Sequence, residues 1–168
     1  QYIDYVDDGD TTSAGGHGTH VAGTAVGAVY FGQSKYSKYA PYDGVGRGAK
    51  IAFFDIGDGD GTLTIPSDTT DIYGTAYNAT ARIHTNSWGY DCTQSTTSGC
   101  RYRTQDLAMD TFAYQNPDML IFVAAGNDGS YTGYDDDNGA NENKWQTQSL
   151  GSPAHAKNIV SAGKCVTH

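Results

Sequence analysis

The sequence predicts an α/β domain with three layers, in which helices cover both faces of a mainly parallel, twisted sheet. Its 168 residues are enough for one domain with a sizeable core. Four short apolar runs typical of buried strands alternate along the chain with stretches in which apolar residues recur at helical spacing. Such alternation builds βαβ units, whose right-handed crossovers bring the strands together in parallel.

The strand candidates are short runs of apolar and β-branched residues. The run Leu-Ile-Phe-Val-Ala at 120–124 is continuously apolar, which is typical of a central parallel strand covered on both faces. No internal repeat accompanies this pattern. The expected strands lie at 51–54, 82–86, 120–124 and 158–162.

Three helices are expected between the strands, at 17–30, 71–81 and 104–115. In the first, apolar residues recur at i, i+1, i+4, i+5 and i+8 and form one stripe. The third begins with Thr104 as its expected N-cap and carries Asp106 in its first turn, where a carboxylate interacts favourably with the helix dipole. The Asn-Pro pair that follows stops this helix.

The polar segments that follow the strands form the expected binding edge, because open parallel sheets bind ligands beyond the carboxyl ends of their strands. These segments are 55–57, 86–89 and 125–127. Two further polar stretches, 31–48 and 128–149, are too long to be simple connections. They are expected to be surface insertions.

The composition disfavours several classes of partner. Ten Lys and Arg against nineteen Asp and Glu give a net charge of −9, which opposes binding to nucleic acid and to anionic membranes. The longest apolar run, 119–125, is far shorter than the ~20 residues of a membrane-spanning helix. The 22 Gly and 13 Tyr, with only 17% charged residues, favour an extracellular protein. No signal peptide is recognisable, so we expect a mature or truncated chain.

The most informative stretch is Gly-Gly-His-Gly-Thr-His at 15–20. Glycines precede an amphipathic helix whose first turn carries His17, so backbone or substrate can approach this ring closely. Histidine titrates near neutrality and is therefore a candidate general base. Two other interpretations are packing histidines and a metal site formed with His20, three residues on. The zinc motif H-E-x-x-H has glutamate where this chain has Gly18, so no metal is expected here.

Five blocks of the sequence together resemble the subtilisin-like serine proteases, the subtilase family or peptidase S8. They occur in the order of that family and extend over about residues 14–163. They match its histidine motif, the turn and strand after it, a substrate-lining strand, the oxyanion-asparagine segment and the start of the next strand. The third block is closest to the alkaline, oxidation-resistant branch and its protist relatives. The blocks are 16–23 (GHGTHVAG), 44–51 (GVGRGAKI), 81–89 (ARIHTNSWG), 122–129 (FVAAGNDG) and 152–158 (SPAHAKN).

The resemblance implies a subtilisin-like fold and specific roles for the matching residues. His17 matches the triad histidine, which takes the proton of a serine hydroxyl and returns it to the leaving amine. Asn127 matches the oxyanion donor, although Asn-Asp-Gly alone would indicate an ordinary turn. The strip after 86 resembles one that pairs with an extended substrate, and the small residues resemble pocket walls, although they also permit close packing. The residues expected to bind substrate are Ser87, Trp88, Gly89, Ala124, Ala125 and Gly126.

Two members of the triad are not found in the sequence. The family order is Asp, His, Ser, and no Gly-Thr-Ser block follows the histidine, since Ser152 fits the start of a strand instead. No acid before the histidine both follows a strand-like run and leads into Thr-Gly or Ser-Gly. These acids are Asp4, Asp7, Asp8 and Asp10.

Residues 1–168 are therefore expected to be the central part of a subtilisin-like catalytic domain, incomplete at both ends and inactive alone. The expected function is that of a secreted serine endopeptidase that cleaves unfolded polypeptides broadly. Its expected partners are polypeptide substrates and the rest of its own catalytic domain. The alternative is an inactive homologue with a peptide-binding or structural role. A metal hydrolase is disfavoured by the missing glutamate.

Two cysteines are close enough in sequence for a local disulfide. Cys92 and Cys100 are separated by seven residues, and a bond between them would contribute roughly 2–3 kcal/mol, with free thiols as the alternative. Cys165 is left over for pairing outside this segment. The absence of C-x-x-C disfavours zinc. Asn78 begins an Asn-Ala-Thr sequon, which is relevant only in a secreted protein.

No cofactor is required for the expected chemistry. Two acidic runs, 58–61 and 135–138, offer oxygen ligands for a structural calcium ion. Neither run matches an EF-hand, and a solvated acidic loop is the alternative interpretation.

Overall fold

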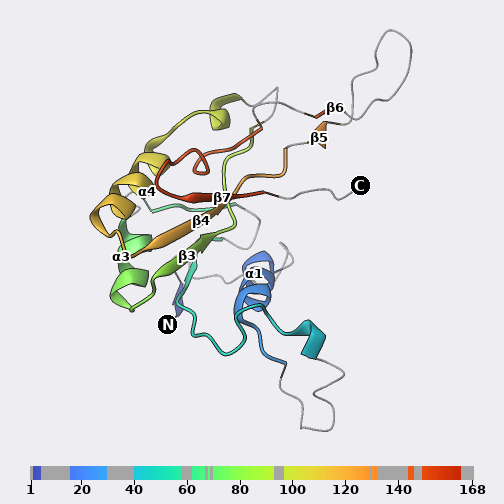
Figure 1. Ribbon diagram of the computed structural model, residues 1–168. Coiled ribbons are helices and arrows are strands. Elements are labelled where there is room, and N and C mark those ends of the chain that lie inside the picture. The colour runs from blue at the N-terminus through green and yellow to red at the C-terminus, as the bar shows by residue number, and fades with distance from the viewer. Residues whose placement is uncertain are drawn as a thin grey trace. The chain divides into compact units, whose positions relative to one another are not determined.

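The computed structural model contains two compact units, Gln1–Ala81 and Arg82–His168, and each is described by itself. Both hold parallel strands together with helices (Figure 1), so the predicted α/β class is confirmed. The predicted single sheet with helices on both faces would have to include strands from both units. It stays a prediction. The residues that the structure describes are 2–4, 16–29, 40–57, 62–66, 68, 70–92, 97–128, 130–131, 144–145 and 149–163.

The first unit contains a parallel strand pair. β1 (Tyr2–Asp4) pairs with β2 (Phe53–Asp55), and Asp4 lies opposite Asp55. β2 begins two residues later than predicted. The sequence patterns do not predict β1, because three residues are too few to give a periodic signal. Asp4 is the last residue of this strand. Asp4 is still followed by Tyr-Val, not by Thr-Gly or Ser-Gly.

Two α-helices of this unit begin close to their predicted positions and end earlier. α1 (His17–Val26) ends at Gly27, whose φ of −55° and ψ of 143° lie outside the helical region. α3 (Thr70–Asn78) is closed by Thr80, which has a positive φ of 71°. The N–H of Ala81 donates to the carbonyl of Ala76 at 3.0 Å, as in a Schellman motif. This local closure stops the helix before residue 81.

The segment after η1 (Ala40–Tyr42) supplies backbone partners for the last turn of α1. The N–H of Val45 donates to the carbonyl of Thr24 at 3.0 Å, and the N–H of Gly46 donates to that of Ala25 at 2.7 Å. Carbonyls of a last helical turn have no partner within the helix. Part of the predicted 31–48 insertion therefore caps the helix that begins with His17.

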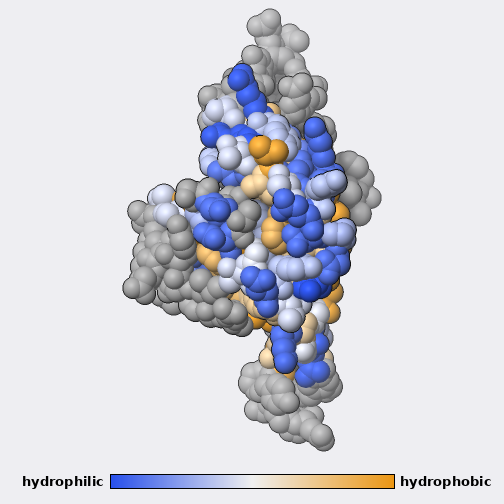
Figure 2. All heavy atoms as spheres, turned by 90° about the vertical axis from the view of Figure 1, so that its left-hand side faces the viewer, coloured by the Kyte–Doolittle hydropathy of each residue, from blue (hydrophilic) through white to orange (hydrophobic). Residues whose placement is uncertain are grey.

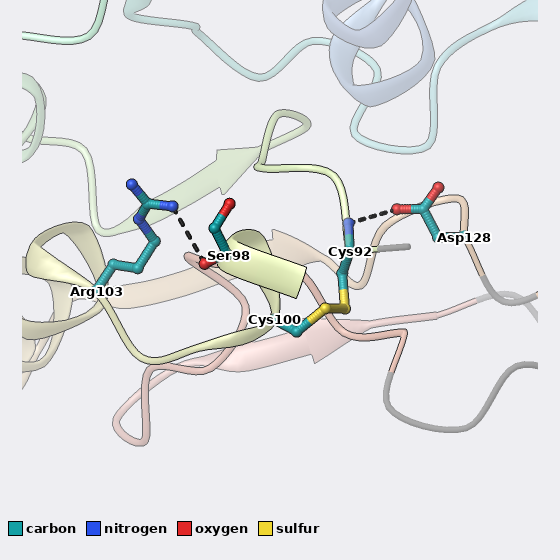
Figure 3. Close-up of a disulfide and its surroundings, with 5 residues drawn as sticks. All are labelled: Cys92, Ser98, Cys100, Arg103 and Asp128. Atoms are coloured by element: carbon teal, nitrogen blue, oxygen red, sulfur yellow. Dashed lines mark hydrogen bonds between the residues drawn. A yellow bond between two sulfur atoms is a disulfide. The ribbon is translucent and has the colours of Figure 1, made fainter. Parts of the chain in front are cut away.

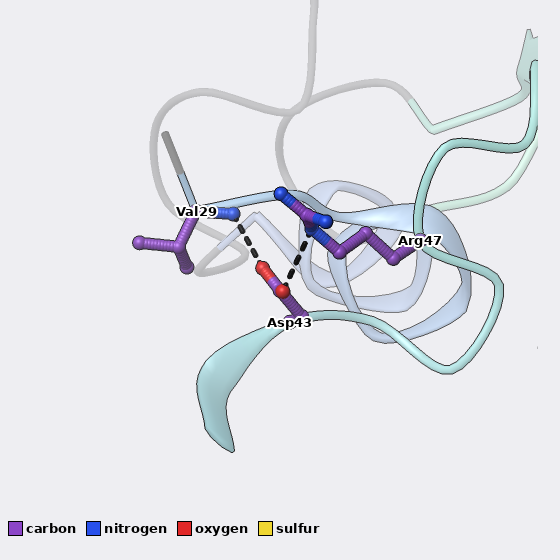
Figure 4. Close-up of polar contacts among 3 residues, drawn as sticks. All are labelled: Val29, Asp43 and Arg47. Atoms are coloured by element: carbon purple, nitrogen blue, oxygen red, sulfur yellow. Dashed lines mark hydrogen bonds and ion pairs between the residues drawn. The ribbon is translucent and has the colours of Figure 1, made fainter. Parts of the chain in front are cut away.

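An acidic side chain holds this cap in place (Figure 4). The Asp43 carboxylate accepts a hydrogen bond from the N–H of Val29 at 2.7 Å. Its other oxygen lies 2.8 Å from Nε of Arg47. The two contacts connect the chain that leaves α1 to the chain that returns to it.

The second unit is built around a three-stranded parallel sheet in the order β3-β4-β7 (Figure 1). Asn86 lies opposite Val123, and Ala124 lies opposite Ala162. The middle strand has its predicted bounds, and the outer two begin one and two residues later than predicted. The bounds are β3 (Ile83–Asn86), β4 (Leu120–Ala124) and β7 (Val160–Ala162).

The apolar core of this unit lies on one side of β4. Ile121 and Val123 are buried, whereas Leu120, on the opposite face, is 43% exposed. The helix α4 (Thr104–Gln115) has its predicted bounds and packs against β4. A second helical layer over the face of Leu120 stays a prediction.

The N-terminus of α4 differs from the prediction in its cap. Thr104 is the first helical residue and Arg103 is the N-cap, so the expected role of Thr104 is wrong. The Asp106 carboxylate accepts from the N–H of Arg103 at 2.7 Å, and this bond closes the first turn. The same carboxylate accepts from the hydroxyl of Ser152 at 2.5 Å, and both side chains are fully buried. Asp106 therefore joins α4 to the segment before β7.

Asp110, one turn further along α4, fixes the chain just before β7. Its carboxylate accepts from the N–H of Lys157 at 2.6 Å and from that of Asn158 at 2.7 Å. It also accepts from the hydroxyl of Tyr102 at 2.7 Å, which raises the pKa of Tyr102 to about 12. Figure 2 shows the side on which α4 lies, where hydrophilic side chains surround smaller apolar patches.

Three shorter elements complete the second unit. η2 (Thr97–Cys100) precedes α4. Within the predicted 128–149 insertion, β5 (Ser130–Tyr131) pairs antiparallel with β6 (Lys144–Trp145). This stretch therefore contains a hairpin-like strand pair rather than loop alone.

The substitution Gly44→Ala is expected to destabilise the protein by roughly 1–3 kcal/mol, because overpacking forces backbone to move. An added Cβ would lie 2.5 Å from the backbone N of Gly27 and 2.6 Å from the carbonyl oxygen of Gly23. Urea unfolding measures the effect. Gly74→Ala is the control, because its Cβ would enter open space within α3. Equal midpoints for the two variants would contradict this account of the cap.

The substitution Asp106→Ala is expected to lower the free energy of unfolding by about 2–4 kcal/mol, because it removes the helix cap and leaves the buried Ser152 hydroxyl without an acceptor. Leu107→Ala, at the next position, is the control, since Leu107 is 56% exposed. Denaturant midpoints compare the two variants. If Asp106→Ala lowers the free energy of unfolding no more than Leu107→Ala does, the contacts of Asp106 contribute little to stability.

Candidate active site

The carboxyl edge of the β3-β4-β7 sheet brings together two of the predicted site segments. Because β3 and β4 are parallel and in register, the chain leaves both strands at the same edge. Residues 87–89 follow β3, and residues 125–127 follow β4. All six residues predicted to bind substrate belong to this edge, either at the end of β4 or directly after the two strands.

The strip after β3 is fixed at its base by Asn86, which is buried. Its side-chain N–H group donates to the carbonyl of Phe122 in β4 at 3.1 Å. The indole N–H of Trp88 donates to the Asn86 carbonyl oxygen at 3.3 Å. Ser87 and Gly89 are exposed, whereas Trp88 is half-buried. The strip thus presents exposed backbone from a base that is bonded to the neighbouring strand.

The histidine in β3 is held neutral below this strip. Nδ1 of His84 lies 3.0 Å from the side-chain nitrogen of Asn86. Burial lowers the pKa of His84 from 6.5 to about 4, because the charged ring would lose its hydration. The neutral ring can accept a hydrogen bond from Asn86 at Nδ1. His84 therefore has a structural role in orienting Asn86, which sequence reasoning did not assign.

Gly89 is placed against the segment that contains Ser152. A Cβ at Gly89 would lie 3.1 Å from the carbonyl oxygen of Ser152, which also accepts from the N–H of Tyr90 at 2.8 Å. A larger residue would press on this carbonyl. Local packing thus favours the small size expected of position 89.

The loop after β4 carries Asn127 with an exposed side chain. The N–H of Ala125 donates to the carbonyl of Ala162 at 2.9 Å, so the β4–β7 ladder extends to this residue. Gly126 has a φ of +102°, a conformation that strongly favours glycine. The chain then bends at Asn127 and forms a turn at Asp128, so the amide expected to act in catalysis lies at the bend itself.

The disulfide predicted between Cys92 and Cys100 is present (Figure 3). The N–H of Cys92 donates to the Asp128 carboxylate at 2.8 Å, and a guanidinium N–H of Arg103 donates to the carbonyl of Ser98 at 3.2 Å. Sequence reasoning assigned no role to Asp128. In the sequence, Asp128 is only an acid that directly follows the candidate oxyanion asparagine. Its partner, the N–H of Cys92, becomes apparent only in the folded structure.

In the first unit, His17 opens α1 with an exposed side chain. Gly16 precedes it in the left-handed conformation, with a φ of 66° and a ψ of 40°. The N–H of His20 donates to the carbonyl of Gly16 at 2.9 Å, which forms the first helical bond. His20 is also exposed. The glycine before His17 is therefore a conformational requirement of the helix start.

The comparison with family models decides the class of the protein. A model described as the subtilase family, peptidase S8, matches residues 2–167. The chain belongs to the subtilase family. The resemblance of the five sequence blocks is thereby confirmed, and with it the assignment to a family of serine proteases.

Curated relatives of this subtilase chain come from Dictyostelium discoideum. The serine protease/ABC transporter B family protein tagD is 35% identical over 162 residues, or 95% of the chain. The proteins tagB and tagA of the same description are 36% and 32% identical over 75% and 67% of the chain. The chain spans only 7% of the length of tagD and 6% of the length of each of the other two.

Several expectations about the subtilase chain are left as predictions. His17 and Asn127 lie in different units, so their expected proximity is one of them. Cys165 and the acidic runs 58–61 and 135–138 lie outside the described residues. Among the residues that the structure describes, no group of three or more His, Cys, Asp or Glu could hold a metal ion, and no helix is long and apolar enough to cross a membrane.

The stability of the subtilase chain is expected to fall as the pH falls from 6.5 to 4. Above pH 6.5 the His84 ring is neutral in both the folded and the unfolded chain. Below pH 6.5 the ring is protonated first in the unfolded chain, which stabilises the unfolded state relative to the folded one. The loss amounts to at most roughly 3 kcal/mol. Urea midpoints measured across this pH range should change less in His84→Gln than in the parent. Parallel pH profiles for the two proteins would contradict this role of His84.

Proposed function

We propose that this chain is the part of a secreted serine endopeptidase that supplies the triad histidine, the oxyanion asparagine and the substrate-binding strip. Subtilase membership supports a serine protease in general. The observation that carries the finer proposal is the common edge of β3 and β4, from which the strip 87–89 and Asn127 both emerge. An oxyanion donor must lie beside the scissile carbonyl of a peptide held by such a strip.

His17 acts in this proposal as general base and then as general acid. Its imidazole takes the proton of the serine hydroxyl as the oxygen attacks the peptide carbonyl, and later gives that proton to the leaving amine. Its exposed position at the start of α1, directly after Gly16, supports this role, because a general base must be within reach of the serine hydroxyl.

Asn127 stabilises the tetrahedral intermediate. The side-chain N–H donates to the oxygen on which negative charge develops during attack. Support comes from its exposed side chain and from its place at the bend that follows β4. Both features leave the amide accessible to a bound peptide.

The substrate is a polypeptide in extended conformation. The backbone of Ser87, Trp88 and Gly89 pairs with it as an added strand, so affinity depends little on sequence. Ala124, Ala125 and Gly126 form small walls for one substrate side chain. Broad cleavage of unfolded polypeptides follows from this mode of binding.

The triad serine and aspartate come, in this proposal, from residues outside the given 168, and the chain alone is inactive. The protein functions in the secretory pathway or outside the cell, where the disulfide is stable. Asn78, the exposed last residue of α3, and the exposed Thr80 make the sequon accessible for glycosylation. Structural calcium at the acidic runs belongs to the same proposal.

A serine-directed fluorophosphonate is expected to label the full-length protein but not the isolated 168-residue chain. His17→Ala should abolish the labelling, because the serine is then not activated. His20→Ala, which changes the neighbouring exposed histidine, is the control and should still be labelled. Labelling of the isolated chain would show that the nucleophile lies within it. A full-length protein that resists labelling would favour the inactive peptide-binding module.

The substitution Asn127→Ala in the full-length protease is expected to lower kcat by roughly 10²–10³-fold with little change in KM, a size known from subtilisin, another member of this family. The donor acts on charge that exists only after attack, so ground-state binding is spared. Steady-state hydrolysis of a peptide substrate measures both constants. A rise in KM at unchanged kcat would contradict the oxyanion role.

A further inference from the structure

The geometry points to Asp128 as a positioning residue for Asn127, held in place by the loop that the Cys92–Cys100 disulfide closes. This inference rests on the proposed oxyanion role of Asn127. Asp128 itself touches no reacting atom. It acts by fixing the backbone on the far side of the catalytic amide.

The segment that carries Asn127 is fixed at both ends. On one side, the N–H of Ala125 donates to the carbonyl of Ala162 and continues the β4–β7 ladder. On the other side, the half-buried Asp128 carboxylate accepts from the N–H of Cys92 at 2.8 Å. Between these two points lie Gly126, which has a positive φ, and the exposed Asn127, at which the chain bends. The Asp128 contact therefore limits where the amide can lie.

The anchor at Cys92 is itself buried and covalently bonded. Cys92 is fully buried and is bonded to Cys100. Gly99, beside Cys100, accepts from the N–H of Ser152 at 2.9 Å. A Cβ at Gly99 would clash with the carbonyl of Asp91, so Gly99 lies directly against the backbone that leads into Cys92. A donor in such a loop can hold a carboxylate from a distant segment in one place.

Three further contacts connect this loop and Tyr90, which lies just before it, to the start of α4. A guanidinium N–H of Arg103, the N-cap residue of α4, donates to the carbonyl of Ser98 (Figure 3). The same guanidinium lies over the ring of Tyr90, 4.1 Å from its centroid. The side-chain N–H of Gln105 donates to the Tyr90 hydroxyl at 3.2 Å. The anchor of Asp128 is thus supported from a helix, and not only from the disulfide.

The substitution Asp128→Ala in the full-length protease is expected to lower kcat by roughly 10–100-fold at nearly constant KM, because small displacements of a catalytic group cost that much. Asp128→Asn keeps an oxygen that can accept from the Cys92 N–H, and it should restore most of kcat. Asp91→Ala removes an exposed carboxylate beside Cys92 and should leave both constants unchanged. Steady-state kinetics on a peptide substrate compares the three variants.

A double-mutant cycle separates positioning from general destabilisation. Asp128→Ala should lower kcat in the parent but have no further effect in an Asn127→Ala background, because the amide that it positions is gone. A peptide boronate, whose adduct places an oxygen in the oxyanion site, should bind Asp128→Ala more weakly by the same factor as kcat falls. A change in folding alone would lower kcat equally in both backgrounds.

The outcomes distinguish this inference from the proposed function. If Asn127→Ala leaves kcat unchanged, the oxyanion role itself fails. If Asn127→Ala lowers kcat while Asp128→Ala does not, or if Asp128→Asn fails to restore it, the positioning role is overturned. A Cys92→Ser/Cys100→Ser variant should lose kcat as Asp128→Ala does. Full kcat in that variant would overturn the part assigned to the disulfide loop.

Discussion

The parallel, in-register pairing of β3 with β4 is the constraint on which the candidate site depends. It brings the ends of two strands that are far apart in sequence to one edge of the sheet, and Asn86 links them directly through the carbonyl of Phe122. A shift of one residue in this register would turn Asn86 away from its side of the sheet. The strip after β3 and the turn after β4 would then no longer have the relative positions that the candidate site needs.

Buried and half-buried carboxylates hold the connections around this sheet. Asp106 joins the start of α4 to Ser152, Asp110 holds the chain that leads into β7, and Asp128 joins the turn after β4 to the disulfide loop. Each accepts from a backbone N–H group or a hydroxyl, and Asp106 and Asp110 each accept from more than one donor, which stabilises their charge. An acidic chain thus uses some of its carboxylates as internal acceptors, while others contribute to its polar surface.

The sequence predicts strong local signals well and distant partners poorly. α4 and β4 have their predicted bounds because their patterns are long and uninterrupted. β1 is too short for a pattern, and Arg103 replaces Thr104 as the cap because the acceptor at 106 bonds to its N–H. The motifs indicate the family and the candidate residues. The supporting bonds of Asp106 and Asp128 join residues 46 and 36 positions apart, which no local pattern reveals.

The roles proposed for His17, Asn127 and the strip 87–89 are tested most directly by a crystal structure of the full-length protease with a peptide phosphonate bound to its serine. We expect the side-chain nitrogen of Asn127 to lie within hydrogen-bond distance of the phosphonyl oxygen and the His17 ring to face the serine oxygen. We also expect the inhibitor backbone to pair with residues 87–89. A structure in which either side chain points away from the bound inhibitor would contradict the account.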